Sequence, residues 1–254
     1  MEWEAPAIVL SAAPYGEGGV VAHVFARERG SFRGLVRGGA SRAQAAIWQP
    51  GNLIRADWRA RLVDQLGTLK GELVHPCAAG AMNSAFCLAM LSAACAVADG
   101  ALPEREAHPD CFEALITLLT LVGVNPADGE GRGPAALVRW EASLLRELGY
   151  GLDLSRCAAT GEREGLDLVS PRTGRAVRSD AAGEWRDRML RLPPLLMDPA
   201  VDGDPEQWRD GLALTGHFLA RDVFGVRHRP VPAARVRLVD MVERMADGGA
   251  APAA

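Results

Sequence analysis

The side chains with the clearest chemical potential in this chain are arginines clustered near its amino terminus. Five of them lie within residues 27–42, at spacings that suit β-strands and their turns: Arg27, Arg29, Arg33, Arg37 and Arg42. Only one acidic side chain lies among them, although the whole chain carries a formal net charge of −4. Guanidinium groups bind phosphate oxygens through several donors at once. A local positive cluster in an acidic chain therefore predicts a surface that follows the backbone of a nucleic acid.

Three of these arginines form the centre of the predicted interface. Arg33 and Arg37 share one face of an expected strand, and Arg42 follows in a turn. Arg27 and Arg29 flank Glu28, and an equally good interpretation of this pair is a strand edge kept soluble by charge.

A later segment, "LIRADWRARL", extends the same chemistry. Apolar side chains at positions 54, 56, 58, 60 and 62 alternate with charged ones, which predicts a strand with one buried face. The other face carries Arg55, Arg59 and Arg61. We expect Arg59 and Arg61 to continue the phosphate-binding surface.

Proteins that bind single strands also use aromatic platforms on which bases stack. Tyr15 and Trp48 are the best candidates in this region because turn residues surround them. Phe32 and Trp58 occupy positions expected of core residues.

The elements that position these side chains change character near residue 76. Before it, apolar residues recur with period 2 in runs separated by turns such as "YGEGG", "RGGASR" and "QPGN". The five predicted strands lie near residues 7–11, 20–27, 31–37, 54–62 and 65–74. This pattern predicts a small closed or nearly closed barrel, of which the OB-fold is the commonest five-stranded kind and an SH3-like barrel is the alternative.

After residue 76 the apolar period becomes 3.6, which predicts helices. The apolar stripes lie at residues 86–97, 112–119, 137–148 and 208–219, and a last helix is expected at 234–245. The segment at about 153–183 is rich in turn residues and indicates an irregular subdomain. The chain is therefore predicted to be a two-domain α+β protein, with an OB-fold barrel over 1–76, an all-α helical domain over 77–246 and a flexible tail over 247–254.

Composition narrows the function classes. Apolar residues make up 48% of the chain, no long uncharged apolar run occurs, and "MEWEAPAIVL" lacks the basic start of a secretory signal, which together predict a cytoplasmic protein. The five cysteines form no C-x-x-C pair, so disulfides are not expected. No phosphate-binding loop, hydrolase elbow or recognisable histidine–acid constellation is present, so we expect no enzymatic activity.

Several segments in a fixed order resemble the RecO family of bacterial DNA repair proteins. They are "IVLSAAPYGEGGVVAHVFARERGSFRGLVRGGASR", "QPGN", "LGTLKGELV", "VRWEASLLRELGYGLDLSRC" and "SPRTGRAV". The resemblance spans nearly the whole chain, and it implies an OB-fold followed by a helical domain without catalytic activity. It also implies a recombination mediator that binds single- and double-stranded DNA and anneals complementary strands. With the partner RecR, such a protein helps to load RecA onto strands coated by single-strand binding protein (SSB).

The resemblance also raises the question of zinc. Many relatives carry two C-x-x-C pairs in the irregular subdomain, a spacing that suits tetrahedral thiolate coordination. Here only Cys157 matches, and the other three positions hold Thr160, Arg178 and Ala181. We therefore expect no zinc and no other cofactor, and a zinc-finger-like backbone held by packing and hydrogen bonds.

One residue of the helical domain is a candidate for partner binding. The family's helical domain binds the acidic, apolar-ended carboxyl tail of SSB, and Arg139 matches an arginine at this place in some relatives. An equally good interpretation is an ion pair of Arg139 with Glu141 or a neighbouring helix.

Two functions from different classes remain. The favoured one is the DNA-binding recombination mediator; the alternative is a non-catalytic adaptor whose basic barrel face binds an acidic protein or RNA.

Overall fold

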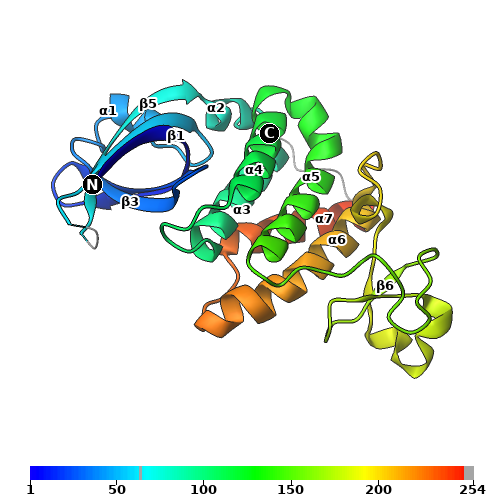
Figure 1. Ribbon diagram of the computed structural model, residues 1–254. Helices are drawn as coiled ribbons and strands as arrows, with labels where there is room; N and C mark the ends of the chain where they lie inside the picture. The colour runs from blue at the N-terminus through cyan, green and yellow to red at the C-terminus, as the bar shows by residue number, and fades with distance from the viewer. Residues whose placement is uncertain (63–64, 249–254) are drawn as a thin grey trace.

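The computed structural model describes residues 1–62 and 65–248. Five strands come first and helices follow, which confirms the predicted α+β class (Figure 1). Among the described helices, none is long and apolar enough to cross a membrane. The expected tail lies mostly at 249–254, outside the described residues.

The strands form a closed barrel in the order β1-β2-β3-β5-β4. Their bounds are β1 Glu2–Tyr15, β2 Gly19–Ala26, β3 Gly30–Val36, β4 Leu53–Arg59 and β5 Gly67–His75. All neighbours are antiparallel except β3 and β5, which run parallel where Gly34 lies opposite Gly67. The first strand begins earlier than predicted because its first residues pair with the end of β4, Glu2 opposite Arg59.

Three large aromatic side chains fill the barrel. Trp58 is 1% exposed, and its ring centroid lies 5.0 Å from that of Phe32 and 6.3 Å from that of Trp3. Gly67 makes room for this cluster, since a Cβ at that position would lie 2.4 Å from the Trp58 ring. The prediction that Phe32 and Trp58 are core residues is therefore confirmed.

A short helix lies where only a turn was predicted. Helix α1 (Arg42–Ile47) connects β3 to β4 and is followed by Trp48, whose indole nitrogen donates a hydrogen bond to the Gln44 side chain at 3.2 Å. The Trp48 ring packs against β5, where a Cβ at Gly71 would come within 2.8 Å of it. The helix therefore serves to seat an aromatic side chain on the barrel wall.

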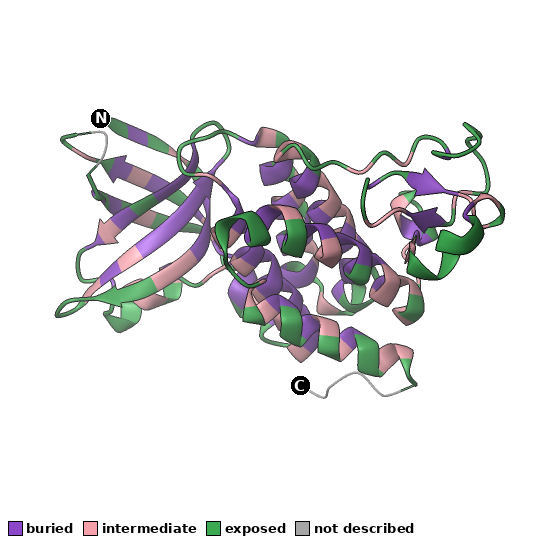
Figure 2. Ribbon diagram, turned by 90° about the horizontal axis from the view of Figure 1, so that it is seen from below, coloured by how far each residue is buried: buried purple, intermediate pink, exposed green. Residues whose placement is uncertain are grey.

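The helical region begins directly after β5. Its helices are α2 Cys77–Ala81, α3 Ala85–Ala101, α4 Pro109–Val124, α5 Pro126–Glu147, α6 Pro205–Phe218 and α7 Ala233–Ala246. A π-helical turn η4 (Leu219–Phe224) and a 3₁₀ turn η5 (Gly225–Arg227) follow α6. These helices contain the apolar stripes expected from the 3.6-residue period, and their buried faces form one core (Figure 2).

The segment between α5 and α6, where an irregular subdomain was predicted at about 153–183, contains a small sheet that the sequence pattern did not indicate. It forms a small sheet in the order β7-β6-β8, from Leu168–Val169, Ala176–Val177 and Leu190–Arg191, with 3₁₀ turns η1 (Ser179–Ala181), η2 (Gly183–Arg188) and η3 (Pro194–Leu196). A separate small core holds it together, formed by Cys157, Leu168, Val177 and Ala182. This segment has few apolar side chains and frequent turns, which explains why its sequence shows neither the period of 2 expected of strands nor the period of 3.6 expected of helices.

Barrel and helices share packed surface. Ile8, Leu10 and Phe25 of the barrel belong to the helical core, and the Phe25 ring lies 5.4 Å from that of Phe112 on α4. The Asp99 carboxylate of α3 accepts hydrogen bonds from Ser11 of β1, at 2.7 Å, and from His23 of β2, at 2.5 Å. These contacts hold the barrel against α3 and α4.

Candidate nucleic-acid interface

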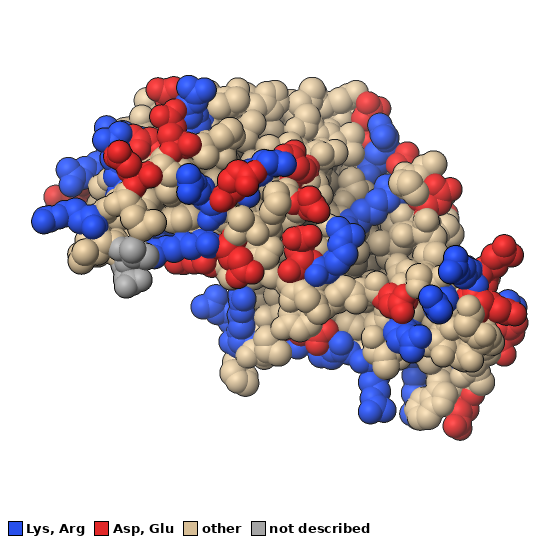
Figure 3. Space-filling model, in the orientation of Figure 1, with Lys and Arg blue, Asp and Glu red and all other residues tan. Residues whose placement is uncertain are grey.

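A groove with a cavity volume of about 910 Å³ runs over the outer surface of the barrel. Its walls come from β1, β3, β4, β5 and the start of α1. The charged side chains that line it are Arg37, Arg55 and Lys70 on one hand and Glu4, Asp57 and Glu72 on the other. Figure 3 shows the same mixture of signs over the barrel surface. The groove as a whole is therefore balanced in charge, and its capacity to bind anions depends on which cations are unpaired.

Among the predicted arginines, Arg37 and Arg42 are the two that lie at the groove without an acidic partner among the described residues. Arg37 lines the groove just after β3, and Arg42 begins α1 beside the groove residue Ser41. Both side chains are exposed, and within residues 1–62 and 65–248 neither makes an ion pair or side-chain hydrogen bond. Their guanidinium donors are free to bind phosphate.

Arg33 lies on the outer face of β3, whereas Arg37, predicted on the same strand face, lies just beyond the end of the strand. Arg33 also has a partner. Its Nε lies 3.0 Å from Glu104 Oε1, on the connection between α3 and α4. Arg33 lies outside the groove lining. A phosphate would have to compete with Glu104 for this side chain, so Arg33 contributes less than the sequence suggested.

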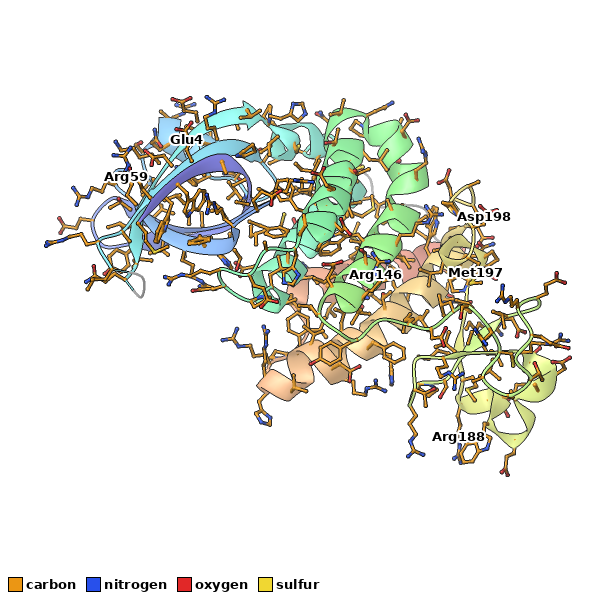
Figure 4. The ribbon with its side chains drawn as sticks, viewed as in Figure 1. Glu4, Arg59, Arg146, Arg188, Met197 and Asp198 are labelled. Carbon is orange, nitrogen blue, oxygen red and sulfur yellow. The ribbon has the colours of Figure 1, made fainter. Side chains whose placement is uncertain are left out.

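The arginines of β4 are also paired. Arg59 donates to Asp57 at 3.0 Å and lies 3.7 Å from Glu2, and these carboxylates raise its pKa above the usual value. Arg55 lies 3.6 Å from Glu4. Figure 4 shows Glu4 and Arg59 on the outside of the barrel. Arg61 lies beyond the end of β4, which corrects its predicted position on the strand, and neither Arg59 nor Arg61 lines the groove.

The two aromatic candidates have different positions. Tyr15 ends β1 at the β1–β2 hairpin and is 56% exposed, so its ring remains a candidate platform for a base. Trp48 is 2% exposed. The prediction that Trp48 offers a stacking surface is wrong for this conformation, because α1 and β5 enclose the ring.

Sequence reasoning missed Lys70, the only lysine of the chain. It lies on β5 and lines the groove, directly opposite Asp57 on the neighbouring strand β4. The alternation that could have identified Lys70 as an exposed strand residue lies in "GTLKGEL", where the exposed Thr68, Lys70 and Glu72 are separated by Leu69 and Gly71, which are less exposed.

Arg139 is engaged within the helical region. It donates hydrogen bonds to the carbonyl oxygens of Leu195 at 2.8 Å, Asp198 at 3.1 Å and Val201 at 2.5 Å. The contacted segment, which includes the labelled Asp198, lies on the side of the helices away from the barrel (Figure 4). Arg139 thus anchors the chain before α6, and the alternative pairing with Glu141 is wrong because Glu141 binds Arg235.

The residues at the family's zinc position do not fit that metal. Cys157 Sγ accepts a hydrogen bond from the backbone N–H of Arg178 at 3.5 Å, and no other thiol is present in this segment. The Arg178 guanidinium is bound to Asp180 and Glu162. Tetrahedral zinc needs four donors such as thiolates and imidazoles, and one cysteine cannot supply them.

The Cys157 thiol nevertheless keeps an unusual environment. Burial raises its pKa, but hydrogen bonds from the Thr160 hydroxyl and from the backbone of Arg178, Thr160 and Ala159 outweigh burial and lower the pKa from 9.0 to about 7. Burial raises the pKa of the other four thiols, to about 11 for Cys77 and about 12 for Cys111.

We expect thiolate absorbance at 240 nm to show one titration step near pH 7, lost in Cys157→Ser. A lowered pKa favours the folded state at pH values where the thiol is ionised. This contribution to the free energy of unfolding should therefore be complete above pH 9, the pKa of the thiol in the unfolded chain, and should be lost as the pH falls toward 7. Parallel urea unfolding of wild type and Cys157→Ser at about pH 6.5 and about pH 9 would measure it. An absorbance step unchanged by the substitution would contradict the assignment.

Comparison with known proteins identifies the family. A family model described as Recombination protein O N terminal matches residues 1–77, and one described as Recombination protein O C terminal matches residues 82–230. The protein named DNA repair protein RecO from Gluconacetobacter diazotrophicus is 59% identical over 99% of each chain. The RecO proteins of Granulibacter bethesdensis (97% of this chain, 98% of theirs) and Acidiphilium cryptum (98% of each) are 58% and 57% identical. With one model matching the barrel and the other most of the helical region, the chain belongs to the RecO family.

Proposed function

We propose that this protein is a DNA repair and recombination mediator that binds single- and double-stranded DNA and anneals complementary strands. In this role it acts in the cytoplasm with RecR to load RecA onto single-stranded DNA coated by SSB. The proposal includes no catalytic step and no metal. Its support comes from the RecO family membership and from the groove on the barrel.

The observation that carries DNA binding is that Arg37 and Arg42, which pair with no acid among the described residues, lie at a groove on a closed five-stranded barrel. We propose that this barrel is an OB-fold, since the strand order β1-β2-β3-β5-β4 with one parallel pair suits a five-stranded Greek-key barrel. OB-folds bind single strands through a positive groove along the backbone together with aromatic platforms. Tyr15 is the exposed aromatic of this barrel and takes the stacking role.

Replacing Arg37 and Arg42 together by alanine should weaken binding of single-stranded DNA. Each lost phosphate contact lowers the slope of log affinity against log salt by about 0.7, so the slope should fall by about 1.4 and affinity at about 0.1 M salt by about 25-fold. Fluorescence anisotropy of a labelled oligonucleotide across a salt series measures both quantities.

The matched control is Arg27→Ala/Arg59→Ala, which removes the same charge from arginines outside the groove lining that are already paired with Glu28, Glu113, Glu2 and Asp57. We expect this control to change the slope by much less. Equal effects of the two double variants would contradict the assignment to Arg37 and Arg42.

Annealing separates the mediator from the adaptor. Complementary SSB-coated oligonucleotides should anneal faster with the wild-type protein than without it, as measured by energy transfer between two end labels. Absence of any acceleration would favour the adaptor that binds an acidic protein or RNA.

A further inference from the structure

We propose that the turn at residues 225–230, which connects η4 to α7, is a second phosphate-binding surface that holds the same DNA strand beside the helices. This inference rests on the proposed DNA-binding function and extends it from the barrel to the helical region. Its chemical partner is the phosphate backbone of single-stranded nucleic acid.

The turn and the first half of α7 are unusually basic. Residues 223–239 contain four arginines and one histidine and no acidic residue: Arg227, Arg229, Arg235, Arg237 and His228. Arg235 is buried and bound to Glu141, whereas the other three arginines and His228 are exposed. In the part of the chain that the structure describes, Arg227, Arg229 and Arg237 make no ion pair. Four arginines of the barrel, by contrast, pair with an acid: Arg27, Arg33, Arg55 and Arg59.

The backbone of the turn is held in one shape. His228 adopts a left-handed conformation with φ of 52°, which is uncommon outside glycine and costs free energy. Two hydrogen bonds fix this shape, from His228 N to the Gly225 carbonyl and from Arg229 N to the Phe224 carbonyl, each at 3.0 Å. The result is that Arg227 and Arg229 project from a rigid turn, which reduces the entropy lost when they bind a ligand.

The turn lies at the junction of barrel and helices. Arg227 donates one guanidinium hydrogen bond to the Gly100 carbonyl at the end of α3, at 3.0 Å, and keeps its other donors. Arg229 lines a cavity of about 420 Å³ whose walls include Leu10 and Pro50 of the barrel region and Phe224. In Figure 1 the orange segment after α6 extends from the helices toward the barrel side, and Figure 3 shows basic side chains on it.

One acid borders the same cavity, and its charge is already engaged. The Asp99 carboxylate accepts hydrogen bonds from Ser11 and His23. Burial raises the Asp99 pKa, but these bonds outweigh burial and keep the pKa below its ordinary value. Asp99 therefore stays ionised, yet its hydrogen-bonding capacity is directed at the barrel and not at Arg229.

Hydrogen bonds connect both this turn and strand β3 with the end of α3 and the segment after it, since Arg227 donates to the Gly100 carbonyl. The connection after α3 contacts β3, because Arg105 N donates to the Ser31 carbonyl at 2.9 Å and Glu104 pairs with Arg33. Arg37 follows Arg33 by four residues, just after the end of β3, about 13 Å away along an extended backbone. Exposed arginines without an ion pair to any described residue thus lie both in this turn and just after β3, and a partner that reached both would be an extended nucleic acid and not a short acidic peptide.

Binding of oligonucleotides of two lengths tests the inference in the full-length protein. For Arg227→Ala/Arg229→Ala, we expect affinity for a strand of about 20 nucleotides to fall about 25-fold at about 0.1 M salt, with the salt slope lowered by about 1.4. A strand of about 6 nucleotides, near the short end of what one OB-type barrel covers, should bind the variant as it binds wild type. The charge-conserving change Arg227→Lys/Arg229→Lys should restore most of the slope.

The matched control is Arg156→Ala/Arg163→Ala, which removes two exposed arginines that make no ion pair with any described residue and lie in the segment between α5 and α6. This control should leave binding of both strands unaffected. If the affinity and slope of Arg227→Ala/Arg229→Ala for the longer strand equal those of wild type while Arg37→Ala/Arg42→Ala still weakens binding, the inference fails and the proposed function stands. If wild type binds no DNA, the proposed function itself fails. Loss of polyglutamate binding with unchanged DNA affinity would assign the turn to an acidic protein and overturn the inference.

Discussion

Replacing Glu141 by alanine should lower the free energy of unfolding by about 3–5 kcal/mol, because it leaves a buried guanidinium without its counter-charge. The Glu141 side chain is fully buried on α5, and that of Arg235 on α7 is 5% exposed. Two hydrogen bonds join them, Nε to Oε1 at 2.6 Å and Nη2 to Oε2 at 2.8 Å. Burial lowers the pKa of Arg235, but the Glu141 carboxylate outweighs burial and raises it, so the arginine stays charged in the wild-type protein. Urea unfolding followed by circular dichroism measures the loss.

A second variant separates the charge effect from general damage to the core. Replacing both partners by apolar residues of similar volume, Glu141→Leu/Arg235→Met, removes the unpaired charge, and buried pairs exchanged in this way often lose little stability. We expect the double variant to be more stable than Glu141→Ala. A double variant as unstable as the single one would show that packing, and not the unpaired charge, accounts for the loss.

Replacing Trp58 by alanine should have a comparable effect on the barrel, about 3–5 kcal/mol, since it empties the space between Trp3 and Phe32. It also removes the indole donor that binds the Arg33 carbonyl at 2.9 Å. Because β3 carries that carbonyl, we expect weaker DNA binding together with the loss of stability. Denaturant unfolding and the anisotropy assay measure the two effects.

The same substitution at Trp185 is the control, because that ring is 53% exposed and contacts Arg188 on the surface. Surface changes of this kind stay within about 0.5 kcal/mol. Equal destabilisation by Trp58→Ala and Trp185→Ala would refute the assignment of Trp58 to the barrel core.

Which arginines of the barrel pair with acids could not be predicted from the sequence. Alternation correctly placed Arg33 on an exposed face of β3, because side chains on a strand alternate between its two faces, and Arg37 is exposed just after the strand ends. The acid that pairs with Arg33, Glu104, is 71 residues away along the chain. No local pattern reveals such a partner, so Arg33 was predicted to be as available for phosphate as Arg37 and Arg42.

Trp48 and Arg139 illustrate the same limit for turns and helices. Turn residues around Trp48 suggested exposure, but the short helix α1 and the space above Gly71 bury the ring. Arg139 was a candidate for binding the acidic tail of a partner, but its donors reach carbonyl oxygens 56 to 62 residues later. Both outcomes depend on segments that meet only after folding.

The sequence by itself determined the order of strands and helices, the buried face of most of them and the family resemblance, because hydrophobic periodicity and turn residues act over a few neighbouring positions. Only the tertiary structure decided which cations are free. It paired Arg27, Arg33, Arg55 and Arg59 with acids, left Arg37 and Arg42 open at the groove, and brought the acid-free turn near Arg227 to the junction with the barrel. The physical reason is that the charge of a surface depends on side chains brought together across the fold, whereas the period of an element depends on its own residues.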